Sequence, residues 1–255
     1  MWEFSLNLKT ENFELAKYFH NALNSYVQTL EGMVTSHEDN GYISILIAVP
    51  NSKSEQIKSM LLCTITEVIC TKFKSDYLNR ELLLPELDNA SLYAFKRALL
   101  NFDRETDKFI IKKNLILDNN LYLESFYRFR LKSLLDKWEE LVSLSNENKE
   151  YLISKESFID LLKFLVDNLD ICEEEISIVK EQGGYRIYAE DSNIFLDKLI
   201  SEDSMVSSVI DLSPQKINLY FNESSSEINL LERIFEERII INNTSYQNVK
   251  KFKMN

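Results

Sequence analysis

Histidine, glycine, proline and cysteine are all scarce in this chain, which contains 2, 4, 3 and 3 of them among 255 residues. Neither His20 nor His37 has another ligand residue at metal-binding spacing, and a zinc site needs several Cys or His ligands. Four glycines supply none of the glycine-rich loops that bind phosphate groups, and no nucleophile–histidine motif is present. We therefore expect no metal, no cofactor and no catalytic residues, that is, a protein that is not an enzyme.

The cysteines and the N-terminus favour the cytoplasm. An odd and sparse set of cysteines is typical of a reducing compartment. The N-terminal residues lack a cationic region followed by an apolar one, so we expect no signal peptide. No apolar run approaches the roughly 18 residues of a membrane helix, so we expect no membrane association. Cys63 and Cys70 share a helical face by their spacing and are expected to be two core thiols.

Acidic residues outnumber basic ones by 41 to 29, which gives a formal net charge of −12. An acidic protein is repelled by nucleic acid and by anionic membranes, so the net charge disfavours both as partners of the whole molecule. The last third of the chain is the more acidic part. A solvated acidic surface is the simpler interpretation, and a basic partner docking there is the alternative.

Few glycines and prolines also mean few flexible linkers, and the apolar patterns predict an α+β fold in three segments. Residues 1–86 form a β-α-β-β-α unit. Residues 87–170 form a helical segment. Residues 171–255 form a mixed α/β unit with a hairpin and a parallel pair of strands.

The first segment has the clearest patterns. Trp2, Phe4, Leu6 and Leu8 alternate with polar residues, which predicts a half-buried strand. The dipeptide Asn40-Gly41 is typical of a tight hairpin turn. The resulting order is close to a ferredoxin-like split β-α-β arrangement without its last strand.

The central segment is helical except for a break at Asp118-Asn-Asn. Apolar residues recur at steps of three and four from Tyr127 to Val142, which predicts one amphipathic helix. Ser157 is a candidate cap for the following helix. In the last segment, Gly183-Gly184 predicts a hairpin turn, and a short helix opened by Ser224 connects two strands that we expect to be parallel.

Three cations at the start of the long central helix are interleaved with aromatic residues. Arg128, Arg130 and Lys132 stand beside Phe126, Tyr127 and Phe129, and such a set can hold phosphates with its cations and stack bases on its rings. The simpler interpretation is structural, because Tyr127 and Leu131 belong to the apolar stripe and arginines in this position often pair with carboxylates of neighbouring elements. The three cations are our candidate partner-binding residues.

Two segments resemble a known family: Phe126-x-x-Phe129-Arg130-Leu131-Lys132, and Phe158-Ile159-x-Leu161-Leu162-Lys163-Phe164-x-Val166-Asp167. The chain resembles the YtxC family of sporulation proteins from endospore-forming Firmicutes, over about residues 92–241. The resemblance implies a sporulation-associated role and transfers no catalytic residue. Departures from the family pattern mark a divergent member; they are Ser145, Asn146, Ser157 and Asn168.

Together these observations favour a non-enzymatic cytoplasmic protein that binds an unidentified protein partner. The alternative is a nucleic-acid-binding module that uses Arg128, Arg130 and Lys132. A third hypothesis, an enzyme with an unrecognised site, predicts a deep pocket containing carboxylates whose pKa values are displaced.

Overall fold

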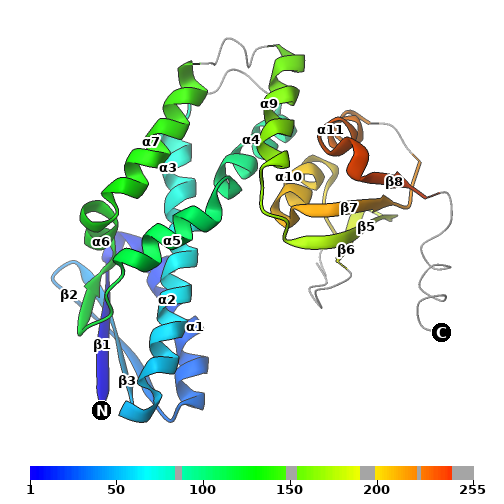
Figure 1. Ribbon diagram of the computed structural model, residues 1–255. Helices are drawn as coiled ribbons and strands as arrows, with labels where there is room; N and C mark the ends of the chain where they lie inside the picture. Colours follow the sequence, from blue (N-terminus) through cyan, green and yellow to red (C-terminus); the bar gives the residue numbers. More distant parts are fainter. Residues whose placement is uncertain (84–87, 148–153, 190–198, 223–224, 243–255) are drawn as a thin grey trace, which may run out of the picture. The chain divides into compact units, whose positions relative to one another are not determined.

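A computed structural model describes residues 1–83, 88–147, 154–189, 199–222 and 225–242 (Figure 1). Helices and two four-stranded mixed sheets make up the fold, so the predicted α+β class is confirmed. Contacts divide the chain into two compact units. Unit 1 comprises Met1–Tyr77 and Glu105–Leu141, and unit 2 comprises Leu78–Arg104 and Val142–Asn255. The division at residues 86 and 170 stays a prediction.

The sheet of unit 1 has the strand order β2-β3-β1-β4. Strands β1 (Trp2–Lys9), β2 (Met33–Asp39) and β3 (Tyr42–Val49) pair antiparallel, and β4 (Asn120–Tyr122) runs parallel to β1. The expected break after Asp118 therefore leads into a strand, which supplies the fourth strand that the predicted layout lacked. Three residues are too few to show alternation, so no local pattern predicted β4.

Alternate side chains of this sheet form the core of unit 1. Phe4, Leu6 and Leu8 of β1 are buried, as predicted, and they face α1 (Phe13–Thr29) and α2 (Ser54–Val68), which lie along one face of the sheet in Figure 1. The predicted hairpin turn is confirmed. Asn40 and Gly41 have φ values of 49° and 80°, a conformation that Asn and Gly tolerate best.

Helix α2 continues through a π-helical segment, η3 (Ile69–Phe73), into α3 (Lys74–Glu81). A π-helical segment holds more residues per turn than an α-helix, so the buried face shifts along the sequence. Cys70 is buried and Cys63 is exposed. The prediction that both cysteines are core thiols is wrong for Cys63.

The predicted single helix from Tyr127 to Val142 is two helices, α6 (Leu123–Arg130) and α7 (Lys132–Glu147), and α5 (Arg104–Asn114) precedes them. Leu131 separates them, with φ −104° and ψ 32°, and its carbonyl accepts the N–H groups of Leu134 and Leu135, both at 3.0 Å. Leu131 is fully buried. The apolar stripe is thus continuous in sequence although the helix is not.

Unit 2 contains the second sheet, with the strand order β6-β5-β7-β8. Its strands are β5 (Glu173–Glu181), β6 (Gly184–Ala189), β7 (Pro214–Leu219) and β8 (Ile239–Ile241). The antiparallel hairpin β5-β6 and the parallel pair β7-β8 confirm the predictions for this segment, and β7 is also parallel to β5. Four helices of this unit are α4 (Asn89–Asn101), α9 (Lys155–Asp167), α10 (Glu202–Leu212) and α11 (Ser226–Phe235).

The starts of these helices differ in part from expectation. Helix α9 begins after Ser154, so Ser157 lies inside the helix and does not cap it. Ser224 lies outside the described residues. In α11 it is the hydroxyl of Ser225 that accepts the N–H of Ile228, at 3.2 Å.

Candidate partner-binding site

Helix α6 is held in place at its first turn. Its Leu123 and Phe126 are buried. The buried carboxylate of Glu124 accepts the backbone N–H of Lys9 at 3.1 Å and the side-chain amide of Asn12 at 2.6 Å. These contacts fix the start of α6 to the end of β1, and so determine which of its side chains face solvent.

The three candidate cations lie on the solvent-facing side of this region. Arg128, Arg130 and Lys132 are exposed, and Phe129 between the two arginines is 79% exposed. Tyr127 instead turns toward the core, where its ring lies 4.7 Å from that of Phe73. We call Arg128, Arg130 and Lys132 the α6 basic surface.

The α6 basic surface has no carboxylate partner in the described part of the chain. None of its three cations forms an ion pair there, so the pairing that the structural interpretation expects is not observed. Lys112 and Lys113, in the last turn of α5, are also exposed and lack an ion pair among these residues. Cations at the end of a helix stabilise its dipole only modestly, typically by about 0.3–1 kcal/mol. The fold therefore makes little use of these charges.

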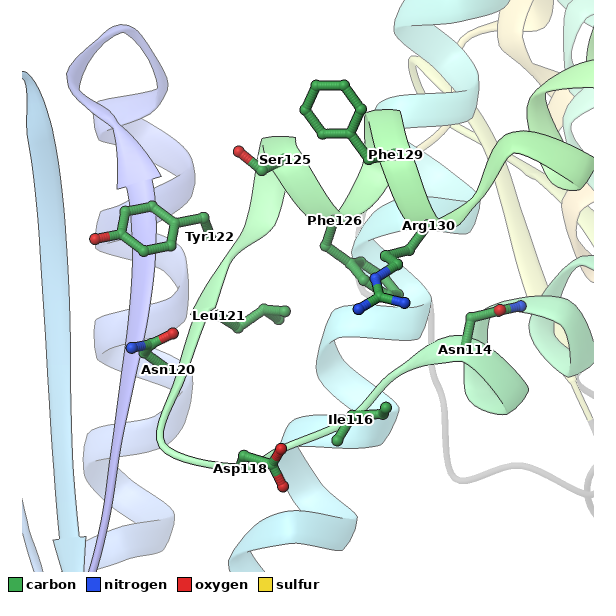
Figure 2. A pocket seen from close by; sticks show the side chains of 10 residues that line it. All are labelled: Asn114, Ile116, Asp118, Asn120, Leu121, Tyr122, Ser125, Phe126, Phe129 and Arg130. Atoms are coloured by element: carbon green, nitrogen blue, oxygen red, sulfur yellow. The ribbon is translucent and has the colours of Figure 1, made fainter.

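A pocket of about 420 Å³ lies beside this surface (Figure 2). Leu121 of β4 and Phe126 of α6 contribute apolar walls, and Figure 2 shows Arg130 extending into the space between β4 and the end of α5. Phe129 points outward at the rim, and Asp118 lies at the opposite end from it. We call this space the β4 pocket. It combines an apolar wall with an arginine that no described carboxylate neutralises.

A second group of charges in unit 1 is buried. Asp107 Oδ2 lies 2.7 Å from Lys74 Nζ, and its Oδ1 lies 2.7 Å from Lys137 Nζ. The indole N–H of Trp138 donates to Oδ2 at 3.1 Å. The side chains of Lys74 and Asp107 are 1% and 0% exposed. We call these four residues the Asp107 cluster; no sequence pattern predicted it.

Burial lowers the pKa of Lys74 below its ordinary value of 10.5, and the neighbouring Asp107 opposes this shift only in part. A lysine with a lowered pKa is sometimes a catalytic base or nucleophile. Neither Lys74 nor Asp107 lines the β4 pocket, so we interpret the Asp107 cluster as structural.

Two carboxyls also have displaced pKa values. The Asp211 pKa is raised by burial and the Glu181 pKa is lowered by Arg186, and neither lines the β4 pocket.

A model of the YtxC-like family matches residues 55–240, which is most of the chain. The chain belongs to the YtxC-like family. The resemblance in the central and last segments is thereby confirmed, and the YtxC-like match begins earlier than the resembling segments, inside α2. It includes the β4 pocket, the α6 basic surface and the Asp107 cluster, whereas β1, β2 and β3 lie before it. No curated protein and no solved structure matches the chain.

The residues that the structure of this YtxC-like chain describes contain neither a metal-binding group of side chains nor a membrane-spanning helix. Within the described ranges, no group of three or more His, Cys, Asp or Glu side chains is arranged to hold a metal ion. In the same ranges, every helix is too short or too polar to cross a bilayer. The β4 pocket with the α6 basic surface is therefore the site that we consider for function.

Proposed function

We propose that this YtxC-like protein is a non-enzymatic interaction protein of the cytoplasm, and that it binds an acidic partner protein in a sporulation-associated process. The observation that carries the proposal is the exposure of Arg128, Arg130 and Lys132 without a carboxylate partner in the described part of a protein whose net charge is −12. Acidic side chains are abundant in this chain. Cations that remain unpaired despite this excess are available to the carboxylates of another molecule.

The chemistry of the surface fits a protein partner. A guanidinium group presents two parallel N–H donors to a carboxylate, which adds geometric specificity to the charge attraction. Arginine and aromatic residues are both enriched at protein interfaces. Phe129, exposed between Arg128 and Arg130, supplies apolar area that desolvates together with the cations when a partner covers them.

A charge-reversal experiment tests the protein-binding part. The tagged wild-type protein and the double variant Arg128→Glu/Arg130→Glu are used to recover partners from sporulating cells at low and high salt. The control is Arg233→Glu, which reverses another exposed arginine on α11 of unit 2. We expect an acidic protein to be retained by the wild type and the control and lost from the double variant. Equal retention by all three would contradict a role for the α6 basic surface.

The sporulation part has its own test. A strain lacking the gene is complemented with the wild-type gene or with the Arg128→Glu/Arg130→Glu variant, and spore yield is measured. We expect a reduced yield that only the wild-type gene restores. A normal spore yield in the deletion strain would refute the sporulation-associated role while leaving partner binding to be judged by the recovery experiment.

Binding of single-stranded nucleic acid is the second candidate. Phe129 is 79% exposed and Tyr122 is 45% exposed, both border the β4 pocket, and exposed rings beside an arginine are a stacking platform for bases. The net charge of the protein opposes this function. A salt-dependent mobility shift with single-stranded RNA is expected in this case, and no shift at low salt would rule it out.

A further inference from the structure

The β4 pocket lies along an unpaired edge of a sheet. Among the strands that the structure describes, in the order β2-β3-β1-β4, strand β4 has a neighbour only on its β1 side. Figure 2 shows β1 on one side of β4 and the side chains of Ile116 and Arg130 on the other. The free edge of β4 is therefore one wall of the pocket.

The sheet register identifies the backbone groups on that wall. The N–H of Ser5 donates to the carbonyl of Asn119 at 3.0 Å, so the Asn119 carbonyl faces β1. Successive residues of a strand direct their hydrogen-bonding groups to opposite edges. The backbone N–H and C=O groups of Leu121 therefore also face β1. The backbone groups of Asn120 and the N–H of Tyr122 face away from β1. No backbone hydrogen bond joins these outward groups to another described segment.

Such an edge is a template for another extended chain. Strand addition supplies affinity through backbone hydrogen bonds, and neighbouring side-chain pockets supply specificity. A strand of only three residues offers few such bonds, so a ligand at this edge needs further contacts. Here the further contacts are Arg130 beside the edge and Phe126 as an apolar wall.

We propose that the free edge of β4 binds an extended acidic segment of the partner protein as an added strand. The segment hydrogen-bonds to the backbone of Asn120 and Tyr122, places a carboxylate on Arg130 and packs an apolar side chain against Phe126. The inference rests on the proposed function, because it assigns the partner that the α6 basic surface binds. It adds that the partner is recognised through its backbone as well as its charge.

Peptide binding tests the proposal. The probe is a fluorescein-labelled peptide that alternates Glu and Val, and its affinity for the full chain is measured by fluorescence anisotropy at low salt. Two further peptides carry N-methyl groups on either the Glu nitrogens or the Val nitrogens. In an added strand only one of these two sets of N–H groups faces β4. We therefore expect one methylated peptide to bind about tenfold more weakly and the other to bind like the parent.

A protein variant tests the same edge from the other side. Asn120→Pro removes an N–H group that faces away from β1, so the pairing with β1 keeps its hydrogen bonds. Asn120→Ala is the matched control, because it removes the side chain and keeps the N–H. We expect the parent peptide to bind Asn120→Pro about tenfold more weakly and Asn120→Ala normally. If Asn120→Pro does not fold, the comparison of the two methylated peptides on the wild-type protein decides alone.

The outcomes separate the two proposals. If the parent peptide binds and requires Arg128 and Arg130, but tolerates both methylation patterns, the acidic-partner function stands and strand addition is overturned. If the parent peptide does not bind at low salt, strand addition is overturned, and the acidic-partner function is decided by the recovery experiment with Arg128→Glu/Arg130→Glu. If the protein alone forms dimers that Asn120→Pro dissociates, a second copy occupies the edge and the assignment to a partner segment is wrong. If single-stranded RNA displaces the peptide and binds more tightly, nucleic acid is the occupant and the assignment is equally wrong.

Discussion

Unit 1 contains two groups of cations that the fold uses in opposite ways. Lys74 and Lys137 both contact Asp107, and both oxygens of that carboxylate accept hydrogen bonds. Arg128 and Arg130 on α6 are exposed, and neither forms an ion pair within the described ranges. The difference shows that a buried carboxylate holds helices of this acidic protein together, while its described residues leave these two surface arginines without a compensating charge. The first group serves the fold, and the second is available for binding.

The energetics of the two groups differ accordingly. Moving two charges into a protein interior costs nearly as much as their attraction returns, so an intact buried pair stabilises little. Removing one partner leaves an uncompensated charge in a poorly polarisable environment, and that is strongly destabilising. An exposed cation remains solvated whether or not a partner is present. Mutations should therefore be costly in the Asp107 cluster and nearly neutral on the α6 basic surface.

The largest effect is expected for Asp107→Ala. This change leaves Lys74, 1% exposed, without its carboxylate, and we expect the free energy of unfolding to fall by about 3–5 kcal/mol. Urea denaturation measures the loss. Asp118→Ala, which removes an exposed carboxylate from the β4 pocket, is the control and should change stability by no more than about 0.5 kcal/mol. Similar losses for both variants would remove the contrast between the buried and exposed charges.

A smaller loss is expected for Trp138→Phe. The ring keeps most of its packing, but Asp107 Oδ2 loses the indole N–H that donates to it at 3.1 Å. A buried acceptor that loses a donor costs about 1–3 kcal/mol. Trp2→Phe makes the same chemical change at a half-buried ring that stacks on Phe4 and has no such acceptor among the described residues. If Trp2→Phe is the more destabilising of the two, the indole hydrogen bond contributes little to the Asp107 cluster.

The pH dependence of stability isolates Lys74. Burial lowers its pKa in the folded protein, so in the pH range between that value and 10.5 the unfolded chain binds more protons than the folded one. Stability then rises with pH across this range. We expect the wild type to gain stability relative to Lys74→Met as the pH is raised from neutral to about 10.5, by roughly 1.4 kcal/mol for each unit of pKa lowering. A stability difference that stays constant or shrinks would mean that Asp107 fully compensates for burial.

Much of the fold followed from patterns within single segments. Alternation along β1 and the dipeptide Asn40-Gly41 were sufficient for the hairpin sheet, because both signals are local. The break at Leu131 has no such signal, since neither proline nor glycine stands there and the apolar stripe continues through it. Strand β4 owes its existence to pairing with β1, more than a hundred residues earlier in the chain, which no local pattern records.

The π-helical segment explains why the Asp107 cluster was missed. Buried positions follow steps of four from Ile57 in α2 to Ile69, the first residue of the π-helical segment. A second series of such steps begins one residue later at Cys70, inside the segment, and continues through Lys74 and Leu78. The shifted series is not recognisable in the sequence, because a lysine is normally assigned to an exposed position.

Only part of the candidate site could be predicted from the sequence. The aromatic residues Phe126, Tyr127 and Phe129 beside Arg128 and Arg130 made α6 the candidate site, and both arginines are exposed. Whether a carboxylate from another element reaches them depends on tertiary structure, so spacing alone left both interpretations open. The β4 edge and Asn114, the last residue of α5, reach the site through the same long-range arrangement.

The smallest effect on stability is expected for the triple variant Arg128→Ala/Arg130→Ala/Lys132→Ala. Its side chains make no ion pair with described residues, so we expect the free energy of unfolding to change by no more than about 0.5 kcal/mol. Arg238→Ala is the matched control, because that arginine donates to Asp167 at 3.0 Å and to the Pro214 carbonyl at 3.3 Å. Its loss should cost about 1 kcal/mol. If the triple variant unfolds more easily than Arg238→Ala, the α6 cations serve the fold after all, and the structural interpretation of the aromatic and basic segment is correct. If it is as stable as the wild type and no longer binds the acidic peptide, the two groups of cations in unit 1 are separated by function as they are by burial.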